Sequence, residues 1–266
     1  MAGETAKLKA IDVKLEYLQK GKAPFSALDG VDLEVRQGEF VTIVGPSGCG
    51  KSTFLTILNG ILPPSNGEVL LDDEPIDRPR REIATVFQDS SLFPWRTALK
   101  NVILGLEIQK VNGKEARDRG QQLIDLVGLK GFENHYPYEL SGGMQQRVNL
   151  ARGLAVDPEV LLMDEPFASL DAQTRETMQL ELLSVWEKTR KTVLFVTHQI
   201  EEAVYLADRL VIFTARPGRV REILKIDLPR PRPLDVKRSQ AFLEYEDYVW
   251  RIIQKEVKEG PKSEMV

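Results

Sequence analysis

The glycine-rich stretch GPSGCGKST, which starts at Gly45, restricts the possible folds of this chain more than any other segment. It directly follows the apolar run FVTIV at residues 40–44, and such a run ending in closely spaced glycines is typical of a buried strand that turns into a helix. Gly45, Gly50, Lys51 and Ser52 occupy the positions that the phosphate-binding-loop pattern requires. Because a chance match occurs in roughly one per cent of chains this long, a phosphate-binding loop is a stronger interpretation than an ordinary glycine turn.

The residue types of this loop suit an anion and a metal ion. Its glycines let backbone N–H groups turn toward phosphate, and the dipole of the following helix favours negative charge at the same place. Lys51 adds positive charge for the outer phosphates, and the Ser52 hydroxyl is a ligand for Mg²⁺. Cys49, the only cysteine, is interpreted as a small packing residue rather than a reactive thiol. The predicted phosphate contacts come from Gly45, Pro46, Ser47, Gly48, Cys49, Gly50, Lys51, Ser52 and Thr53.

The order of strand and helix patterns predicts an α/β fold. Short strand patterns broken by turn residues run up to Gln88, and helical spacing follows as far as about Asp157. After Pro158 the apolar runs in EVLLMDE, TVLFVTH and RLVIFTA alternate with helical stretches, as in buried parallel strands joined by helices. We expect a nucleotide-binding core at 1–88 and 159–228, a helical subdomain inserted at 89–158, and an extended segment and helix at 229–266.

The segment VLLMDEP, residues 160–166, is a buried strand pattern that ends in two adjacent acids. At a strand end beside the phosphate loop, Asp164 can hold the metal through water, and Glu165 can polarise an attacking water. Asp-Glu-Pro is also an ordinary way to leave a strand, but the upstream loop favours the catalytic interpretation. A phosphate loop alone leaves kinases, GTPases and many ATPases as alternatives.

A second anion-binding pattern occurs in ELSGGMQQR, residues 139–147. Ser141 supplies a capping hydroxyl at the start of a helical pattern, and Gly142 and Gly143 allow close backbone approach to a ligand. The chain thus carries two phosphate-binding devices about ninety residues apart. If both cannot reach one nucleotide within a chain, two chains must share it.

These motifs, in this order, resemble those of the ATP-binding cassette (ABC) ATPases, and the resemblance runs from about residue 10 to residue 219. LSGGMQQR is similar to the family's signature, GPSGCGKS to its Walker A loop and LLMDEP to its Walker B strand. The resemblance implies a P-loop NTPase (RecA-like) core with an N-terminal antiparallel β region, and ATP and Mg²⁺ as ligands. It also implies a head-to-tail dimer, with each ATP between one subunit's Walker A loop and the other's signature. A homodimer and a heterodimer are both open.

The resemblance assigns further residues. Gln88 in VFQD resembles the glutamine that contacts the metal and the attacking water. The segment ASLD, which ends in Asp171, resembles the loop that passes along the dimer interface. His198 in VTHQ resembles the histidine that contacts the γ-phosphate. Tyr17 resembles the aromatic that stacks on adenine, with Phe25 as the alternative. The implied catalytic residues are Lys51, Gln88, Glu165 and His198, and the implied metal ligands are Ser52, Gln88 and Asp164.

Finer features concern what the ATPase drives. The apolar stretch SLFPWRTALKNV, residues 91–102, is either a groove for a permease helix or the small core of the helical insert. Its PW pair, Met144 and ARPGRV at 215–220 resemble the nitrate, sulfonate, taurine and bicarbonate branch of importers. This implies uptake of a small anionic solute, with transmembrane permease subunits and a periplasmic solute-binding protein as partners. The chain would then lie peripherally on the cytoplasmic face of the inner membrane.

Charge and hydropathy limit the alternatives. Lys and Arg total 36 against 40 Asp and Glu, for a net charge of -4, so no nucleic-acid partner is expected. No apolar run approaches the ~18 residues of a spanning helix, and no signal peptide is recognised. The alternative function is a soluble ABC ATPase acting on nucleic acid or ribosomes. Such proteins usually carry two cassettes, a coiled-coil insertion or a basic patch, and none of these is visible.

The C-terminal stretch that begins LPRPRP is expected to be extended at first and then helical. An apolar helix face is expected to pack on the core, with binding to a partner as the alternative. The predicted members of this face are Phe242, Tyr245, Val249, Ile252, Ile253 and Val257.

Overall fold

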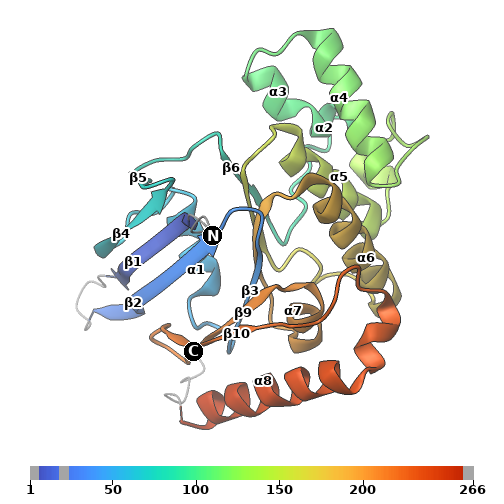
Figure 1. The fold of residues 1–266 in the computed structure, drawn as a ribbon. Helices are drawn as coiled ribbons and strands as arrows, with labels where there is room; N and C mark the ends of the chain where they lie inside the picture. Colours follow the sequence, from blue (N-terminus) through green and yellow to red (C-terminus); the bar gives the residue numbers. More distant parts are fainter. Residues whose placement is uncertain (1–5, 18–23, 260–266) are drawn as a thin grey trace, which may run out of the picture. The chain divides into compact units, whose positions relative to one another are not determined.

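The structure is a computed structural model that describes residues 6–17 and 24–259 (Figure 1). The chain divides into two compact units, one made of Met1–Arg80 with Thr192–Val266 and the other of Arg81–Lys191. The second unit therefore includes two strand segments beside the helices of the predicted insert.

An antiparallel sheet forms the N-terminal part of the first unit. Its strands follow the order β2-β1-β4-β5, and β1 pairs antiparallel with both β2 and β4. Alternate residues of β2 are buried, as expected for a strand with one face on the core. The strands are β1 (Ala6–Tyr17), β2 (Phe25–Arg36), β4 (Asn66–Leu71) and β5 (Glu74–Pro75).

Parallel strands carry the glycine loop of the first unit. Strand β3 (Phe40–Val44) lies between β8 (Thr192–Val196) and β9 (Arg209–Phe213), parallel to both, and β10 (Val220–Lys225) pairs antiparallel with β9. Every residue of β3 and β8 is buried, which explains their continuous apolar sequences. Because Ile43 pairs with Val196, the loop that starts at Gly45 and the segment that carries His198 leave the sheet at the same edge.

Helices α1 (Lys51–Leu58), α7 (Ile200–Leu206) and α8 (Gln240–Glu259) complete the first unit, with the short turn η2 (Leu234–Arg238) before α8. Helix α8 packs on α7 and buries Phe242 and Val249 (Figure 1). The prediction that Val257 shares this face is wrong, because its side chain is 60% exposed. Val257 follows Val249 by eight residues, and because the helix turns 100° per residue its side chain lies about 80° around the helix from that of Val249. Among the described residues, no helix has both the length and the apolar character needed to cross a membrane.

The second unit combines a parallel strand pair with helices. Strand β6 (Ile83–Val86) runs parallel to β7 (Val160–Asp164), with Val86 opposite Met163, so the segments that carry Gln88 and Glu165 leave at the same edge. Helix α5 packs against α2, α3, α4, α6 and β6. The helices are α2 (Ala98–Val102), α3 (Leu104–Ile108), α4 (Gly113–Leu126), η1 (Pro137–Glu139), α5 (Gly142–Ala155) and α6 (Ala172–Thr189).

Candidate functional site

The glycine loop joins β3 to α1 through a backbone that other residues would strain. Gly48 and Gly50 have φ values of +71° and +100°, in the left-handed region that favours glycine. A Cβ atom at Gly50 would also lie 2.9 Å from the backbone oxygen of Ala27. Gly50 is the N-cap of α1 and offers no side chain to its first turn. The loop therefore leads from β3 into the N-terminus of α1, the arrangement in which a helix dipole favours an anion, and phosphate binding there stays a prediction.

Lys51 is buried within the loop it belongs to. Its Nζ donates hydrogen bonds to the backbone oxygens of Gly45 at 2.9 Å and Pro46 at 3.1 Å, and it lies 3.8 Å from the Cys49 sulfur. These oxygens compensate the ammonium charge and hold it over the loop. Burial raises the pKa of the Cys49 thiol, although the charge of Lys51 opposes this shift. The thiol is thus protonated at neutral pH, which favours its interpretation as a packing residue.

His198 and the two candidate aromatics also belong to the first unit. The backbone N–H of Thr197 donates to the oxygen of Ile43 at 3.1 Å, which places the exposed His198 at the level where the glycine loop starts. Tyr17 and Phe25 lie at the paired ends of β1 and β2, with ring centroids 6.3 Å apart. The two aromatics that the sequence leaves as alternatives are therefore neighbours, and Tyr17 is the more exposed.

Arg216, in the turn between β9 and β10, contacts the glycine loop directly. Its Nε and Nη2 atoms donate to the backbone oxygen of Gly48 at 3.2 and 3.0 Å, and its guanidinium lies 4.4 Å from the centroid of the Phe25 ring. A Cβ atom at Gly218 would lie 2.1 Å from the oxygen of Cys49, so this turn packs tightly on the loop. The motif ARPGRV marks the turn, but nothing local in the sequence indicates the contact.

Replacing Arg216 by alanine is expected to weaken ATP binding about fivefold to tenfold. The two charge-assisted hydrogen bonds hold Gly48 in place, and a net loss of about 1 kcal/mol is typical for a partly solvated bond of this kind. Titration with a fluorescent ATP analogue measures the affinity. Arg219→Ala is the matched control, because Arg219 lies in the same turn but bonds to Asp29. An equal loss of ATP affinity in both variants would mean that the affinity depends on the turn as a whole and not on the contact with Gly48.

The acidic pair ends a strand of the second unit. Asp164 is the last residue of β7, and Glu165 follows with a φ of +44°, which is unusual for a residue with a side chain. The backbone N–H of Ala168 donates to the Glu165 oxygen at 3.1 Å and closes a tight turn. Strained backbone of this kind costs of order 1–3 kcal/mol and clusters at active sites. This observation favours the catalytic interpretation of Glu165 over an ordinary strand end.

Side chains of α5 hold the segment around Gln88. Gln146 donates to the Gln88 backbone oxygen, and Asn149 donates to the oxygen of Phe87 at 3.1 Å. Arg152 donates to the oxygen of Ser90 at 2.7 Å, and its own burial lowers its pKa. The three donors are spaced three residues apart, so they share one helix face. The sequence predicts the roles of Gln88 and of the α5 N-terminus but not this connection between them.

The signature residues and Asp171 lie together at two helix starts. The Ser141 hydroxyl accepts from the Met144 N–H at 3.3 Å as the cap of α5, and Asp171 accepts from the Thr174 N–H at 3.0 Å as the cap of α6. The hydrogen bonds from Thr174 lower the pKa of Asp171. A Cβ atom at Gly143 would lie 2.6 Å from Thr174 Cγ2, whereas one at Gly142 would meet no atom within 4 Å. The face of Gly142 is therefore open.

The predicted site residues are divided between the two units. The first unit contains Tyr17, the loop from Gly45 to Thr53 and His198, and the second contains Gln88, Ser141, Gly142, Gly143, Asp164, Glu165 and Asp171. The described residues hold no group of three or more His, Cys, Asp or Glu side chains suited to a metal. Of the predicted metal ligands, Ser52 in the first unit offers a hydroxyl oxygen and Gln88 in the second an amide oxygen, which are donors of the kind that Mg²⁺ prefers, and their role stays a prediction.

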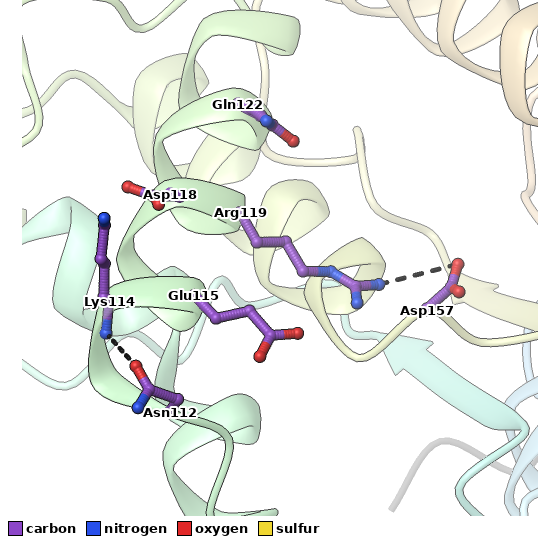
Figure 2. Close-up of a pocket in the computed structure, with 7 residues that line it drawn as sticks. All are labelled: Asn112, Lys114, Glu115, Asp118, Arg119, Gln122 and Asp157. Atoms are coloured by element: carbon purple, nitrogen blue, oxygen red, sulfur yellow. Dashed lines mark hydrogen bonds and ion pairs between the residues drawn. The ribbon is translucent and has the colours of Figure 1, made fainter.

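An open cavity in the second unit contains none of these residues. It has a volume of about 620 Å³ and is lined by Asn112, Lys114, Glu115, Asp118, Arg119, Gln122 and Asp157. Figure 2 shows Arg119 reaching from α4 toward Asp157, and the two charged groups are 3.7 Å apart. Lys191 donates to the same carboxylate at 2.7 Å, which lowers the pKa of Asp157. Acids and bases thus neutralise one another here, and the cavity adds nothing to the predicted site.

Known proteins resemble the chain over most of its length. The family described as ABC transporter matches residues 28–168. An uncharacterized ABC transporter ATP-binding protein of Methanocaldococcus jannaschii is 54% identical over 236 residues, which cover 89% of this chain and 87% of that protein. The aliphatic sulfonates import ATP-binding protein SsuB of Bacillus cereus is 42% identical over 235 residues, 88% of this chain and 91% of that protein.

Solved structures show the same fold. A dimeric ATP-binding cassette in a post-hydrolysis state, bound to ADP and Pi, matches with a TM-score of 0.74 at 36% identity, over 84% of this chain and 100% of that one. The cbiO1 protein from Clostridium perfringens, part of the ABC transporter complex cbiONQ, matches with a TM-score of 0.75 at 27% identity, over 95% and 99%. The predicted α/β fold class, a P-loop NTPase core with a helical subdomain, is confirmed. The chain belongs to the ABC transporter family and is an ATP-binding cassette that hydrolyses ATP.

Proposed function

We propose that this chain is the energising subunit of an ABC importer and drives uptake of a small anionic solute through a membrane permease. The solute class is of the nitrate, sulfonate, taurine or bicarbonate type. The name of the Bacillus cereus relative, an import protein for aliphatic sulfonates, supports this class. The observation that carries the proposal is the exposed aromatic pair of Phe93 and Trp95, which follows closely after Gln88 in the chain. We call this pair the Trp95 surface.

The Trp95 surface is exposed and rigidly supported. Trp95 is 72% exposed, and its ring packs edge-on against Phe93 with centroids 5.4 Å apart. The fully buried Asn101 accepts from the Phe93 N–H at 2.8 Å and donates to the oxygens of Phe93, Arg96 and Thr97. Trp95 is therefore not part of a core of the helical insert. A large aromatic held rigidly in solvent suits an apolar partner, here a helix of the permease.

We propose that ATP lies between the glycine loop of one cassette and the α5 N-terminus of another. The open face of Gly142 supports this. Within the described chain a side chain at this position would meet no atom, so a glycine here leaves room for a ligand from outside the chain. A relative's structure is a dimeric cassette, which also supports it. The second cassette is another copy or a related chain. Residues 89–158 are proposed to act as the helical subdomain that presents Trp95 to the membrane partner, at the cytoplasmic face.

The residues are proposed to divide the hydrolysis between them. Glu165 polarises the attacking water, while Lys51 and His198 stabilise charge on the γ-phosphate. Tyr17 stacks on adenine, and Ser141 and Asp171 act at the interface between cassettes. Ser52, Gln88 and Asp164 would hold Mg²⁺, which supplies charge neutralisation at the phosphates. ATP binding closes the pair of cassettes, and hydrolysis lets it open.

The test is recovery of the partner from native membranes. Tagged Glu165→Gln protein is incubated with ATP and membranes, and co-purified proteins are identified by mass spectrometry. A multi-span membrane protein is expected, and adding Trp95→Asp is expected to lower its recovery about tenfold or more, because buried aromatic anchors dominate such contacts. Ile61→Asp, which changes an exposed apolar residue of the other unit, is the control and keeps recovery high. Recovery of only ribosomal or nucleic-acid-bound proteins would overturn the importer role in favour of a soluble ABC ATPase.

A further inference from the structure

Helix α8 carries a second apolar line besides the face that packs on α7. Leu243, Trp250 and Val257 are 45%, 50% and 60% exposed. They are spaced seven residues apart, so they form one line along the helix, the repeat that pairs helices in coiled coils. We call these three residues the outer stripe. The buried Phe242 and Val249 already supply the contact with the core, so the outer stripe has no such role.

The exposed charges of α8 differ between the two halves of the helix, and Asp247, Arg251 and Lys258 among them lie within about 100° of Trp250 around the helix. The exposed charged residues of the first half are Glu244 and Asp247, a net charge of 0 − 2 = −2. Those of the second half are Arg251, Lys255, Lys258 and Glu259, a net charge of 3 − 1 = +2. Two such helices side by side place acid against base only when they run antiparallel. A parallel arrangement places like charges together, which is unfavourable.

We infer that α8 pairs antiparallel with α8 of a second copy of this chain along the outer stripe. An interface with two-fold symmetry is self-complementary: if residue i contacts residue j, then j contacts i. The equal spacing places Trp250 on the symmetry axis against its own counterpart, and Leu243 opposite Val257. Asp247 and Arg251 form an ion pair at 2.6 Å within the helix. In the antiparallel pair, Asp247 of each copy lies near Arg251 of the other.

The pairing goes beyond the proposed importer role and does not depend on the solute or the permease. Three side chains on a helix about 30 Å long bury too little area to hold two free proteins together, since stable interfaces need about 1,000 Å² or more. The contact acts when another interface already holds two cassettes, because the second contact is then intramolecular. It favours two identical chains over a mixed pair, since identical chains have complementary α8 halves.

Cysteine cross-linking tests the pairing and its register. Each variant is combined with Glu165→Gln and treated with a short bis-maleimide in the presence of ATP, so that the cassettes are already paired when the contact is tested. The natural Cys49 is left in place because it is buried. Trp250→Cys alone is expected to give a cross-linked dimer, whereas Leu243→Cys and Val257→Cys link only when the two proteins are mixed. Tyr248→Cys is the control, because Tyr248 is similarly exposed at 46% but lies 200° around the helix from Trp250. Self-linking of all three stripe variants would indicate parallel pairing and overturn the inference, as would equal linking at Tyr248 or none at Trp250.

Charge reversal supplies an independent check. Adding Glu244→Lys and Asp247→Lys to Trp250→Cys makes both halves of α8 basic, and the yield of dimer is expected to fall about fivefold or more at low salt. Further changing Arg251→Glu and Lys255→Glu restores opposite halves and should restore the yield. Unrestored yield would overturn the role of charge. Because these variants leave Trp95 unchanged and the assay contains no membranes, failure here leaves the importer proposal intact, and failure of the permease test leaves this inference intact.

Discussion

Replacing Glu165 by glutamine is expected to lower the rate of ATP hydrolysis by about 10²–10⁴-fold, the usual contribution of a general base. The amide keeps the size of the side chain but cannot accept a proton from water. ATP affinity is expected to stay unchanged, because the proposed phosphate contacts come from the glycine loop and not from the end of β7. Steady-state phosphate release gives the rate, and titration with a fluorescent ATP analogue gives the affinity.

Glu159→Gln is the matched control for this change. Glu159 immediately precedes β7, at the opposite end of the strand from Glu165, and is exposed. The same chemical change there is expected to leave the rate of hydrolysis at its normal value. A Glu165→Gln protein that loses less than about tenfold in rate would contradict the role of Glu165 as general base. A protein that loses ATP binding as well would instead indicate damage to the fold.

Replacing Arg232 by methionine is expected to lower the free energy of unfolding by about 2–4 kcal/mol, because several buried carbonyl groups lose their partner. Arg232 is only 3% exposed. Its Nη1 donates to the backbone oxygens of Tyr205 and Ala207, both at 2.8 Å, and its Nη2 to that of Leu228 at 3.1 Å. Burial lowers its pKa to about 10, which leaves the guanidinium charged at neutral pH. Urea unfolding of the nucleotide-free protein measures the change.

Arg238→Met is the control for Arg232, because Arg238 is exposed and only a few residues away. A change within about 0.5 kcal/mol is expected there, as for most surface substitutions. A loss below about 1 kcal/mol at Arg232 would show that water replaces its contacts and that the C-terminal segment is only loosely attached. The expected large loss would make this segment part of the first unit, since Arg232 caps the end of α7, the helix that starts two residues after His198.

The contacts of Arg232 illustrate what could not be predicted from the sequence. The segment LPRPRP is recognisable as extended, but nothing in it indicates that one of its arginines is buried against α7. Backbone oxygens at a helix end are not encoded by any particular residue, so their partner can come from anywhere in the chain. Loop oxygens are equally unspecific, because every residue carries one, and this applies to the oxygen of Gly48 bound by Arg216 and to the oxygen of Ser90 bound by Arg152.

Patterns on one helix were predictable only in part. The spacing of Phe242 and Val249 correctly indicates the buried face of α8, but Val257 is apolar and exposed. Periodicity identifies which residues share a line on a helix, yet it does not indicate which of two lines meets the core. Trp95 presents the same ambiguity in a loop. Its type suits both a small core and a docking surface, and its exposure depends on how Asn101 fixes the surrounding backbone.

The sequence by itself determined the fold class and the motifs, because each rests on local requirements. Buried strands need continuous apolar runs, a tight loop before a helix needs glycine at Gly50, and a helix start needs a capping side chain such as Ser141. Only the tertiary structure decided which distant residues support those motifs and which apolar side chains stay in solvent. These outcomes depend on contacts between segments far apart in the chain, and such contacts leave no local pattern in the sequence.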